Sequence, residues 1–177
     1  LRPQLPEDAV VIAADSGIDR ALALGLRIDQ AVGDFDSVSP SGLAAATEAG
    51  ARIEAHPAEK DATDLELALA AAAALSPRRI SVVGSDGGRL DHLLASLLHL
   101  CSPAYAAAEL DAHLGSSRVH VVRGARSLTG AVGSLLSLVP ALGPAEGVTT
   151  RGLAYPLAGE TLHPGTTRGV SNVFTEA

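Results

Sequence analysis

Short apolar runs alternate with stretches of helical periodicity over the first 100 residues. The four pairs of predicted strand and helix span residues 10–14 and 16–24, 31–33 and 40–49, 52–55 and 63–75, and 80–84 and 90–100. Thr63 with Glu66 three residues later forms a capping-box pattern, and Pro40 directly after Ser39 is typical of a helix start. Strands that alternate with helices predict an α/β fold with a doubly wound, mainly parallel sheet.

After Gly115 the helical periodicity stops. Short β-type runs at 118–123 and 134–139 are separated by glycine and proline, which indicates a smaller all-β sandwich domain. We therefore predict an α/β domain over residues 1–115 and a β-sandwich domain over residues 116–177.

The loops that follow the predicted strands are unusually acidic. Right-handed crossovers would bring these loops to one edge of the sheet, where open α/β folds bind ligands. Three loops, at 33–37, 59–64 and 85–92, carry these acids, and the five that would form a cluster are Asp34, Asp36, Asp61, Asp64 and Asp91. Asp34 and Asp36 are two residues apart on an extended segment, so both side chains would point to the same side.

A single aspartate beside a helix start is often only a cap or a favourable partner for the helix dipole. Five converging carboxylates, however, repel one another without a cation, and Mg²⁺ binds such groups together with substrate phosphates. Lys60 and Arg89 lie among the acids and are candidate phosphate clamps. The loop at 13–17 offers backbone N–H groups at a helix start, another place for an anion or a nucleotide. The chain has neither a P-loop nor a dinucleotide fingerprint.

Composition narrows the choice of partners. A net charge of −7 argues against binding to nucleic acid or to an anionic membrane surface, and the longest nearly apolar run is too short to span a bilayer. Cys101 is the one cysteine, which excludes an internal disulfide framework and fits a reducing cytoplasm. The aromatic content of 2% predicts an interior built from aliphatic side chains.

Five motifs in order resemble those of the thiamin pyrophosphokinase family across nearly the whole chain. They are ADSG at 14–17, GDFDS at 33–37, KDATD at 60–64, GSDGGRLDH at 84–92 and TRGVSN at 167–172. The resemblance implies an α/β domain that binds ATP and a β-sandwich that completes the thiamin site across a homodimer interface. It also implies Mg²⁺-dependent transfer of diphosphate from ATP to the thiamin hydroxyl, which releases AMP.

Roles carry over from this resemblance by motif. The implied catalytic residues are Asp34, Asp36, Asp61, Asp91, Lys60 and Arg89, and the four aspartates among them are also the implied metal ligands. Asp61 is our candidate for the base that accepts the hydroxyl proton. The implied nucleotide contacts are Ala14, Asp15, Ser16, Gly17, Asp64, Gly84 and Asp86. The implied thiamin contacts are Arg168, Ser171 and Asn172.

Family members have a further strand before the ADSG motif and another after the SN motif, so we expect the natural protein to extend beyond the sequence. Two other classes of protein remain as alternatives. A magnesium phosphohydrolase or another nucleotide-dependent transferase could use the same acids on a different acceptor, but the late Ser171-Asn172 motif weighs against it. A catalytically silent sensor of thiamin or nucleotide would have lost the acids, and all of them are present.

Overall fold

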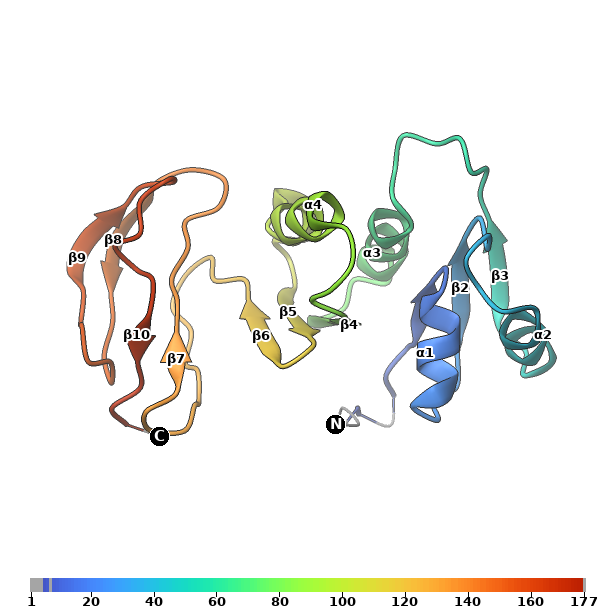
Figure 1. Ribbon diagram of the computed structural model, residues 1–177, viewed down its shortest axis with the longest axis horizontal. Coiled ribbons are helices and arrows are strands. Elements are labelled where there is room, and N and C mark those ends of the chain that lie inside the picture. The colour runs from blue at the N-terminus through green and yellow to red at the C-terminus, as the bar shows by residue number, and fades with distance from the viewer. Residues whose placement is uncertain (1–4, 7, 177) are drawn as a thin grey trace. The chain divides into compact units, whose positions relative to one another are not determined.

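The computed structural model describes residues 5, 6 and 8–176 and divides the chain into two compact units (Figure 1). The first unit comprises residues 1–99 and 104–120, and the second comprises residues 100–103 and 121–177. Strands alternate with helices in the first unit, whereas the second is rich in strands. This arrangement confirms the predicted fold class, an α/β region followed by a smaller strand-rich region.

The first unit begins with a parallel sheet of three strands in the order β1-β2-β3. Its elements are β1 (Ile12–Ala14), α1 (Gly17–Ala23), β2 (Gln30–Gly33), α2 (Pro40–Glu48), β3 (Arg52–Ala55) and α3 (Asp64–Ala74). Figure 1 shows α2 and α3 on opposite sides of this sheet. The carboxyl ends of all three strands face the same edge, as the alternating pattern predicts.

Both helix starts that the sequence marks are confirmed. The hydroxyl of Ser39 accepts a hydrogen bond from the Gly42 N–H at 3.0 Å, and Pro40 is the first residue of α2. The hydroxyl of Thr63 accepts a hydrogen bond from the Glu66 N–H at 3.2 Å. Each cap satisfies one of the N–H groups that the first turn of a helix leaves unpaired. The loops that precede α2 and α3 therefore end at defined points.

Aliphatic side chains, most of them alanines, build the core of this part of the first unit. The buried cluster consists of Ala13, Ile18, Ala21, Ile28, Ala31, Ala46 and Ala51. Phe35 and Val38, from the loop between β2 and α2, pack against this cluster. The alanines allow helix and sheet backbones to approach closely, so the aliphatic interior that the composition predicts is confirmed.

A second sheet follows, made of β4 (Arg79–Gly84), β5 (Glu109–Leu114) and β6 (Ser117–His120). Strands β4 and β5 are parallel, while β5 and β6 form an antiparallel hairpin. The alternating pattern predicts one doubly wound sheet and no strand at 109–114, whereas the structure has a second sheet with β5 at its centre. Pairing with β5 also places residues 117–120 in the first unit, although the sequence pattern assigned them to the β-sandwich. The polar residues Asp111 and His113 interrupt the apolar pattern of β5 and hide it from a periodicity analysis.

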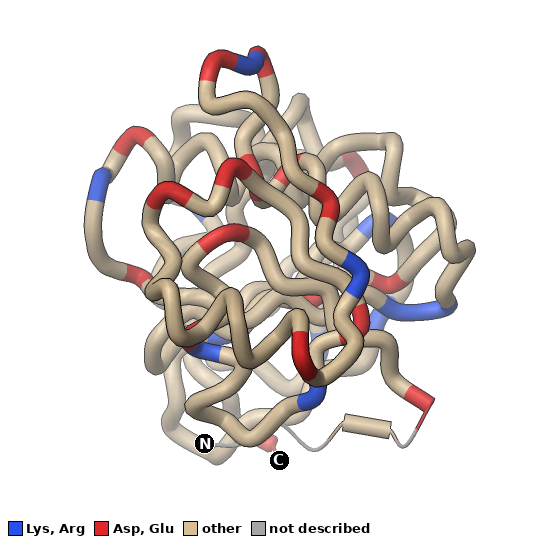
Figure 2. The backbone as a smooth tube through the Cα atoms, turned by 90° about the vertical axis from the view of Figure 1, so that its right-hand side faces the viewer, with Lys and Arg blue, Asp and Glu red and all other residues tan. Residues whose placement is uncertain are grey.

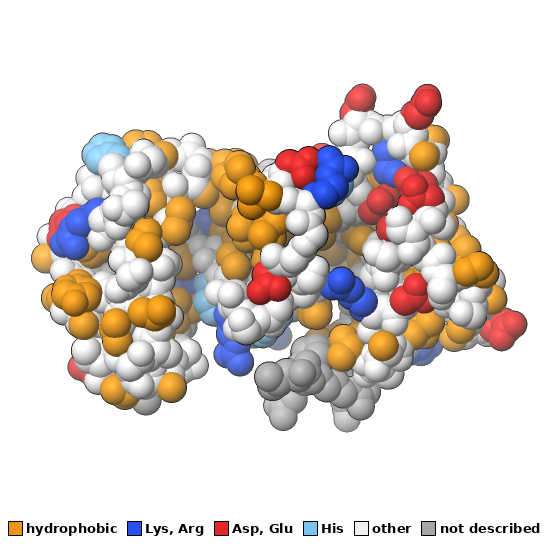
Figure 3. Space-filling view, viewed as in Figure 1, with side chains coloured by type: hydrophobic (Ala, Val, Ile, Leu, Met, Phe, Trp, Pro, Cys, Tyr) orange, Lys and Arg blue, Asp and Glu red, His pale blue; other side chains and the backbone are white. Residues whose placement is uncertain are grey.

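Helix α4 (Leu90–Leu100) and the 3₁₀ helix η1 (Pro103–Tyr105) lie between β4 and β5 in the sequence. Leu100 at the end of α4 is buried, whereas Leu90, Leu94 and Leu98 are 78%, 56% and 41% exposed. Hydrophobic side chains accordingly gather over α4 in the middle of Figure 3. In the part of the chain that the structure describes, no helix has the length and apolar character needed to cross a bilayer.

The second unit contains two small antiparallel sheets, one pairing β7 with β10 and the other β8 with β9. The strands are β7 (Leu135–Leu136), β8 (Ala145–Thr149), β9 (Ala158–Leu162) and β10 (Asn172–Val173). Phe174 lies directly against Gly130, where an added Cβ would fall 2.6 Å from a ring carbon. Leu157 and Leu162 are buried, and they supply part of the unit's apolar interior.

Candidate active site

Three carboxylates meet at the carboxyl ends of β1 and β2. Asp15 directly follows β1, and Asp34 and Asp36 follow β2. The strands are in register at this point, because the Asp15 N–H donates to the Val32 carbonyl at 2.9 Å. One oxygen from each of the three carboxylates lies within 4.8 Å of the others. We call Asp15, Asp34 and Asp36 the acidic cluster.

The backbone of these loops adopts the left-handed region at two non-glycine residues, Asp15 with φ of 44° and Phe35 with φ of 60°. Such conformations cost free energy and concentrate at functional sites. Gly33, with φ of 150°, is the last residue of β2 and directly precedes Asp34. A Cβ there would lie 3.2 Å from the Asp15 Cβ and 3.2 Å from the Asp64 Oδ1, so a glycine lets both acids approach β2 closely.

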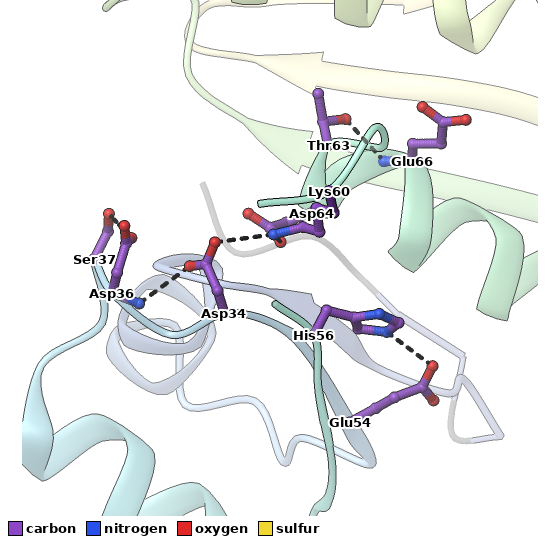
Figure 4. A network of polar contacts seen from close by, with 9 residues as sticks. All are labelled: Asp34, Asp36, Ser37, Glu54, His56, Lys60, Thr63, Asp64 and Glu66. Carbon is purple, nitrogen blue, oxygen red and sulfur yellow. Dashed lines mark hydrogen bonds and ion pairs between the residues drawn. The ribbon is translucent and has the colours of Figure 1, made fainter. Parts of the chain in front are cut away.

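Lys60 connects the acidic cluster to α3 (Figure 4). Its Nζ lies 2.9 Å from Asp34 Oδ2 and 3.1 Å from Asp64 Oδ1, and its side chain is only 14% exposed. The hydrogen bond to Asp34 is the largest cause that raises the pKa of Lys60, and the same bond lowers the pKa of Asp34. Lys60 is therefore held as an ammonium ion between two carboxylates, and its charge offsets part of theirs.

The acidic cluster has the features of a site for a hard divalent cation. Carboxylate oxygens are the ligands that Mg²⁺ prefers, and here they come from two neighbouring strand ends. Asp15 Oδ1 is shielded from solvent and accepts no hydrogen bond among the described residues, which leaves it available to a cation. Figure 2 shows acidic positions outnumbering basic ones on the loops of this region. The residues present therefore fit a bound Mg²⁺.

The structure brings together only some of the residues that the sequence analysis singled out as catalytic or metal-binding. Asp34, Asp36 and Lys60 lie together, and Asp64 joins them through Lys60. Asp61 is exposed on the loop beside Lys60 and is not a member of the acidic cluster. Its predicted role as a metal ligand and base stays a prediction.

Asp15 was expected only as a nucleotide contact, yet it belongs to the acidic cluster. One sequence signal could have identified it: Asp15 follows β1 as Asp34 follows β2, and parallel neighbours end at the same edge. The other predicted nucleotide contacts of this loop, Ala14, Ser16 and Gly17, lie at the junction of β1 and α1. Ser16 occupies the N-cap position of α1 but makes no side-chain capping hydrogen bond.

The loop between β4 and α4 holds the remaining predicted residues of the first unit. Gly84 ends β4, and the Asp86 carboxylate lies against Gly115 in the β5–β6 turn, where a Cβ would fall 2.4 Å from Asp86 Oδ1. Arg89 donates to both carboxylate oxygens of Asp91, at 3.2 and 2.6 Å. Arg89 and Asp91 thus pair with each other, and Asp91 is not a member of the acidic cluster.

The pairing of Arg89 with Asp91 predicts how the stability of the fold depends on pH. Hydrogen bonds from Arg89 are the largest cause that lowers the pKa of Asp91, from 3.8 to about 2. Because the folded-state pKa is depressed, the pair stabilises the fold above about pH 4, and this contribution is lost as the pH falls through about 2. Carboxyl NMR titration should find Asp91 titrating near pH 2 in the wild type and near 4 in Arg89→Leu. An unchanged midpoint in the variant would contradict the pairing.

The predicted thiamin contacts lie in the second unit. Arg168 forms two hydrogen bonds to Glu160, at 3.0 and 2.9 Å. Ser171 is exposed with φ of 61°, and its N–H donates to the Ser137 hydroxyl. Asn172 is 4% exposed, and its side-chain amide both accepts from the Tyr155 N–H at 3.0 Å and donates to the Tyr155 carbonyl at 2.7 Å. The Asn172 side chain therefore pins the Tyr155 backbone.

Asn172→Ala should consequently destabilise the second unit. The substitution removes the two partly buried hydrogen bonds to the Tyr155 backbone, which costs about 2 kcal/mol of unfolding free energy. Urea denaturation followed by circular dichroism measures this loss. Ser171→Ala is the matched control, because the Ser171 contact in this region is made by its backbone N–H and survives the change. Equal stability of the two variants would refute the pinning role of Asn172.

Comparison with known proteins places both units in one family. Residues 2–111 match the family model described as thiamin pyrophosphokinase, catalytic domain, and residues 119–177 match the thiamin pyrophosphokinase, vitamin B1 binding domain. The chain is 36% identical over 91 residues to a thiamine pyrophosphokinase of Bacillus subtilis (strain 168). That match spans 51% of this chain and 42% of the relative, less than half of its length.

Solved structures extend the similarity to nearly the whole chain. The crystal structure of a Bacillus subtilis thiamine pyrophosphokinase superposes with a TM-score of 0.84 at 25% identity, covering 97% of this chain and 81% of that one. A thiamin pyrophosphokinase family protein from Enterococcus faecalis superposes with a TM-score of 0.71 at 29% identity, covering 93% of this chain and 79% of that one. The architecture of both units is therefore shared with these proteins.

Proposed function

This chain belongs to the thiamin pyrophosphokinase family, and on that premise we propose that it transfers diphosphate from ATP to thiamin. The single observation that carries the proposal is the acidic cluster at the carboxyl ends of β1 and β2, with Lys60 beside it. Cation-binding carboxylates next to an ammonium group suit a polyphosphate substrate.

In the proposed reaction the hydroxyl oxygen of thiamin attacks the β-phosphorus of ATP. The bond between that phosphorus and the oxygen bridging to the α-phosphate breaks, and AMP leaves with the electron pair. Asp15, Asp34 and Asp36 would hold Mg²⁺, which when bound neutralises charge on the polyphosphate. Lys60 and Arg89 would orient the phosphates, and Asp61 would accept the hydroxyl proton. Asp64, Gly84, Asp86 and the loop at 14–17 would contact the nucleotide.

We assign thiamin recognition to the second unit. Ser171 and Arg168 are exposed and can offer hydrogen bonds to a ligand, whereas the Asn172 amide is already bonded to Tyr155. The contribution of Asn172 would therefore be to hold the backbone at Tyr155 in place. Tyr155 itself is 62% exposed.

A homodimer with the thiamin site at the subunit interface completes the proposal. The exposed leucines of α4 support it, because three large aliphatic side chains on one helix face are costly to leave in water. A cytoplasmic location agrees with the presence of a single cysteine, Cys101, because one cysteine cannot form an internal disulfide.

Incubation with ATP, thiamin and Mg²⁺, followed by chromatography, tests the proposed reaction. Thiamin diphosphate and AMP should form in equal amounts, and both should disappear in Asp36→Ala. Formation of ADP or free phosphate would instead indicate one of the alternative enzymes, a phosphohydrolase or another transferase. Binding of thiamin or nucleotide without any product would indicate the silent sensor.

A further inference from the structure

A carboxylate outside the acidic cluster joins α1 to the start of α2. Asp19, in the first turn of α1, accepts a hydrogen bond from the Ser39 N–H at 2.9 Å and another from the Ser39 hydroxyl at 2.6 Å. The Ser39 hydroxyl in turn accepts from the Gly42 N–H at 3.0 Å. These bonds also lower the pKa of Asp19, the side-chain bond to Ser39 being the largest cause. We call this arrangement of Asp19, Ser39 and Gly42 the α1–α2 clamp.

Gly42 shows how closely the clamp is packed. A Cβ at position 42 would lie 2.0 Å from Asp19 Oδ1 and 2.9 Å from the Ser39 hydroxyl oxygen. Any side chain there would displace the Asp19 carboxylate. The glycine thus makes room for a carboxylate against the first turn of α2, which is also where a negative charge interacts best with the helix dipole.

The clamp lies at one end of the loop that carries two members of the acidic cluster. Residues 34–39 connect β2 to α2, and the ion pair between Asp34 and Lys60 holds the start of this segment. Asp19 holds its end at Ser39. Between these two points Phe35 has a left-handed backbone, and Asp36 is exposed. The hydrogen bonds of Asp36 in this loop are local, to Asp34 and Ser37.

A capping carboxylate could serve only to stabilise two helices. In that case its loss would lower the stability of the fold but leave ligand affinity unchanged. Among the described residues, the hydrogen bonds of Asp36 are local, so its position depends on the packing of Phe35 and Val38 against the core and on where the two ends of the loop are fixed. Partners that orient the ligands of a cation commonly alter its affinity by about 10- to 100-fold when they are removed.

We propose that Asp19 is a positioning residue that sets the place of Asp36 in the acidic cluster through Ser39. The inference rests on the proposed cation site but not on the identity of the substrates. Asp19 need not touch cation, nucleotide or thiamin. Without the Asp19 carboxylate, Ser39 is free to move. The Asp36 carboxylate then lies farther from those of Asp15 and Asp34.

The test measures the binding of Mn²⁺ alone, by the loss of the electron paramagnetic resonance signal of the free ion. Asp19→Asn should raise the Kd for Mn²⁺ about 10-fold. Ser39→Ala, which keeps the charge of Asp19 but removes one of its two donors, should show a smaller increase. The double variant should bind no more weakly than Asp19→Asn, because both changes act through one arrangement.

Asp29→Asn is the matched control. The Asp29 carboxylate likewise accepts a hydrogen bond from a distant backbone group, the Val11 N–H at 2.9 Å, and its pKa is lowered mainly by that bond. Asp29 directly precedes β2, so it lies at the amino end of the strand, away from the acidic cluster. Its substitution should lower stability in urea without changing the Kd for Mn²⁺.

A normal Kd in Asp19→Asn, or an equal loss in Asp29→Asn, would overturn the inference. Failure of the wild type to bind Mn²⁺ would remove the cation site and the inference with it. Because the assay contains neither ATP nor thiamin, a failed diphosphate transfer beside a normal Mn²⁺ response would refute only the proposed reaction.

Discussion

Asp15→Asn is expected to slow diphosphate transfer by about 100-fold or more while the fold stays intact. Asp15 contributes one of the three carboxylates of the acidic cluster, and its Oδ1 is shielded from solvent with no hydrogen-bond donor among the described residues. A carboxylate in that situation is stabilised by a cation, and an amide cannot replace its charge. The substitution should lower kcat and raise the Mg²⁺ concentration needed for half-maximal rate.

Asparagine is the suitable substitution because the backbone of Asp15 is left-handed, with φ of 44°. Asparagine tolerates that conformation nearly as well as aspartate does, so the loop should keep its shape. Glu59→Gln is the matched control, since it removes one negative charge from an exposed residue beside Lys60. A comparable loss in both variants would mean that overall charge, and not a cation ligand, is responsible.

Lys60→Met is expected to act in opposite directions on catalysis and on cation binding. Diphosphate transfer should fall by about 100-fold, because the ammonium group that would orient the phosphates is lost. The affinity for Mg²⁺ without nucleotide should rise, since Lys60 Nζ lies 2.9 Å from Asp34 and 3.1 Å from Asp64 and offsets their charge. Isothermal titration calorimetry with Mg²⁺ alone separates this second effect from the first.

The control for Lys60→Met is Arg52→Met, which changes the net charge equally. Arg52 is 74% exposed and pairs with Glu54 on β3. It should leave both transfer and Mg²⁺ affinity near the wild-type values. Weaker Mg²⁺ binding by Lys60→Met would show that the lysine orders the carboxylates more than it competes with the cation, which contradicts the expected sign.

Local signals were sufficient for much of the first unit. Thr63 and Ser39 mark the starts of α3 and α2 because their hydroxyls cap N–H groups only three residues away. Such short-range contacts can be predicted from the local sequence. Strand β5 was missed for the opposite reason. Its stability comes from pairing with β4, about 30 residues earlier, and with β6, while Asp111 and His113 break its apolar pattern. Strand pairing over such a separation in the chain produces no periodic pattern of apolar residues that a single sequence would show.

The family and the order of an α/β region followed by a β region could be predicted from the sequence alone, because alternating strands and helices have few physical solutions. The acids of the loops at 33–37 and 59–64 follow neighbouring parallel strands and lie at one sheet edge, whereas the loop at 85–92 follows a strand of the second sheet. Which carboxylates lie together depends on the tertiary structure. It brought Asp15 to Asp34 through the register of β1 on β2, paired Asp91 with Arg89, and placed Lys60 between Asp34 and Asp64. These contacts depend on ångström-scale distances between segments that are far apart in the chain. The spacing of residues along the sequence does not specify such distances.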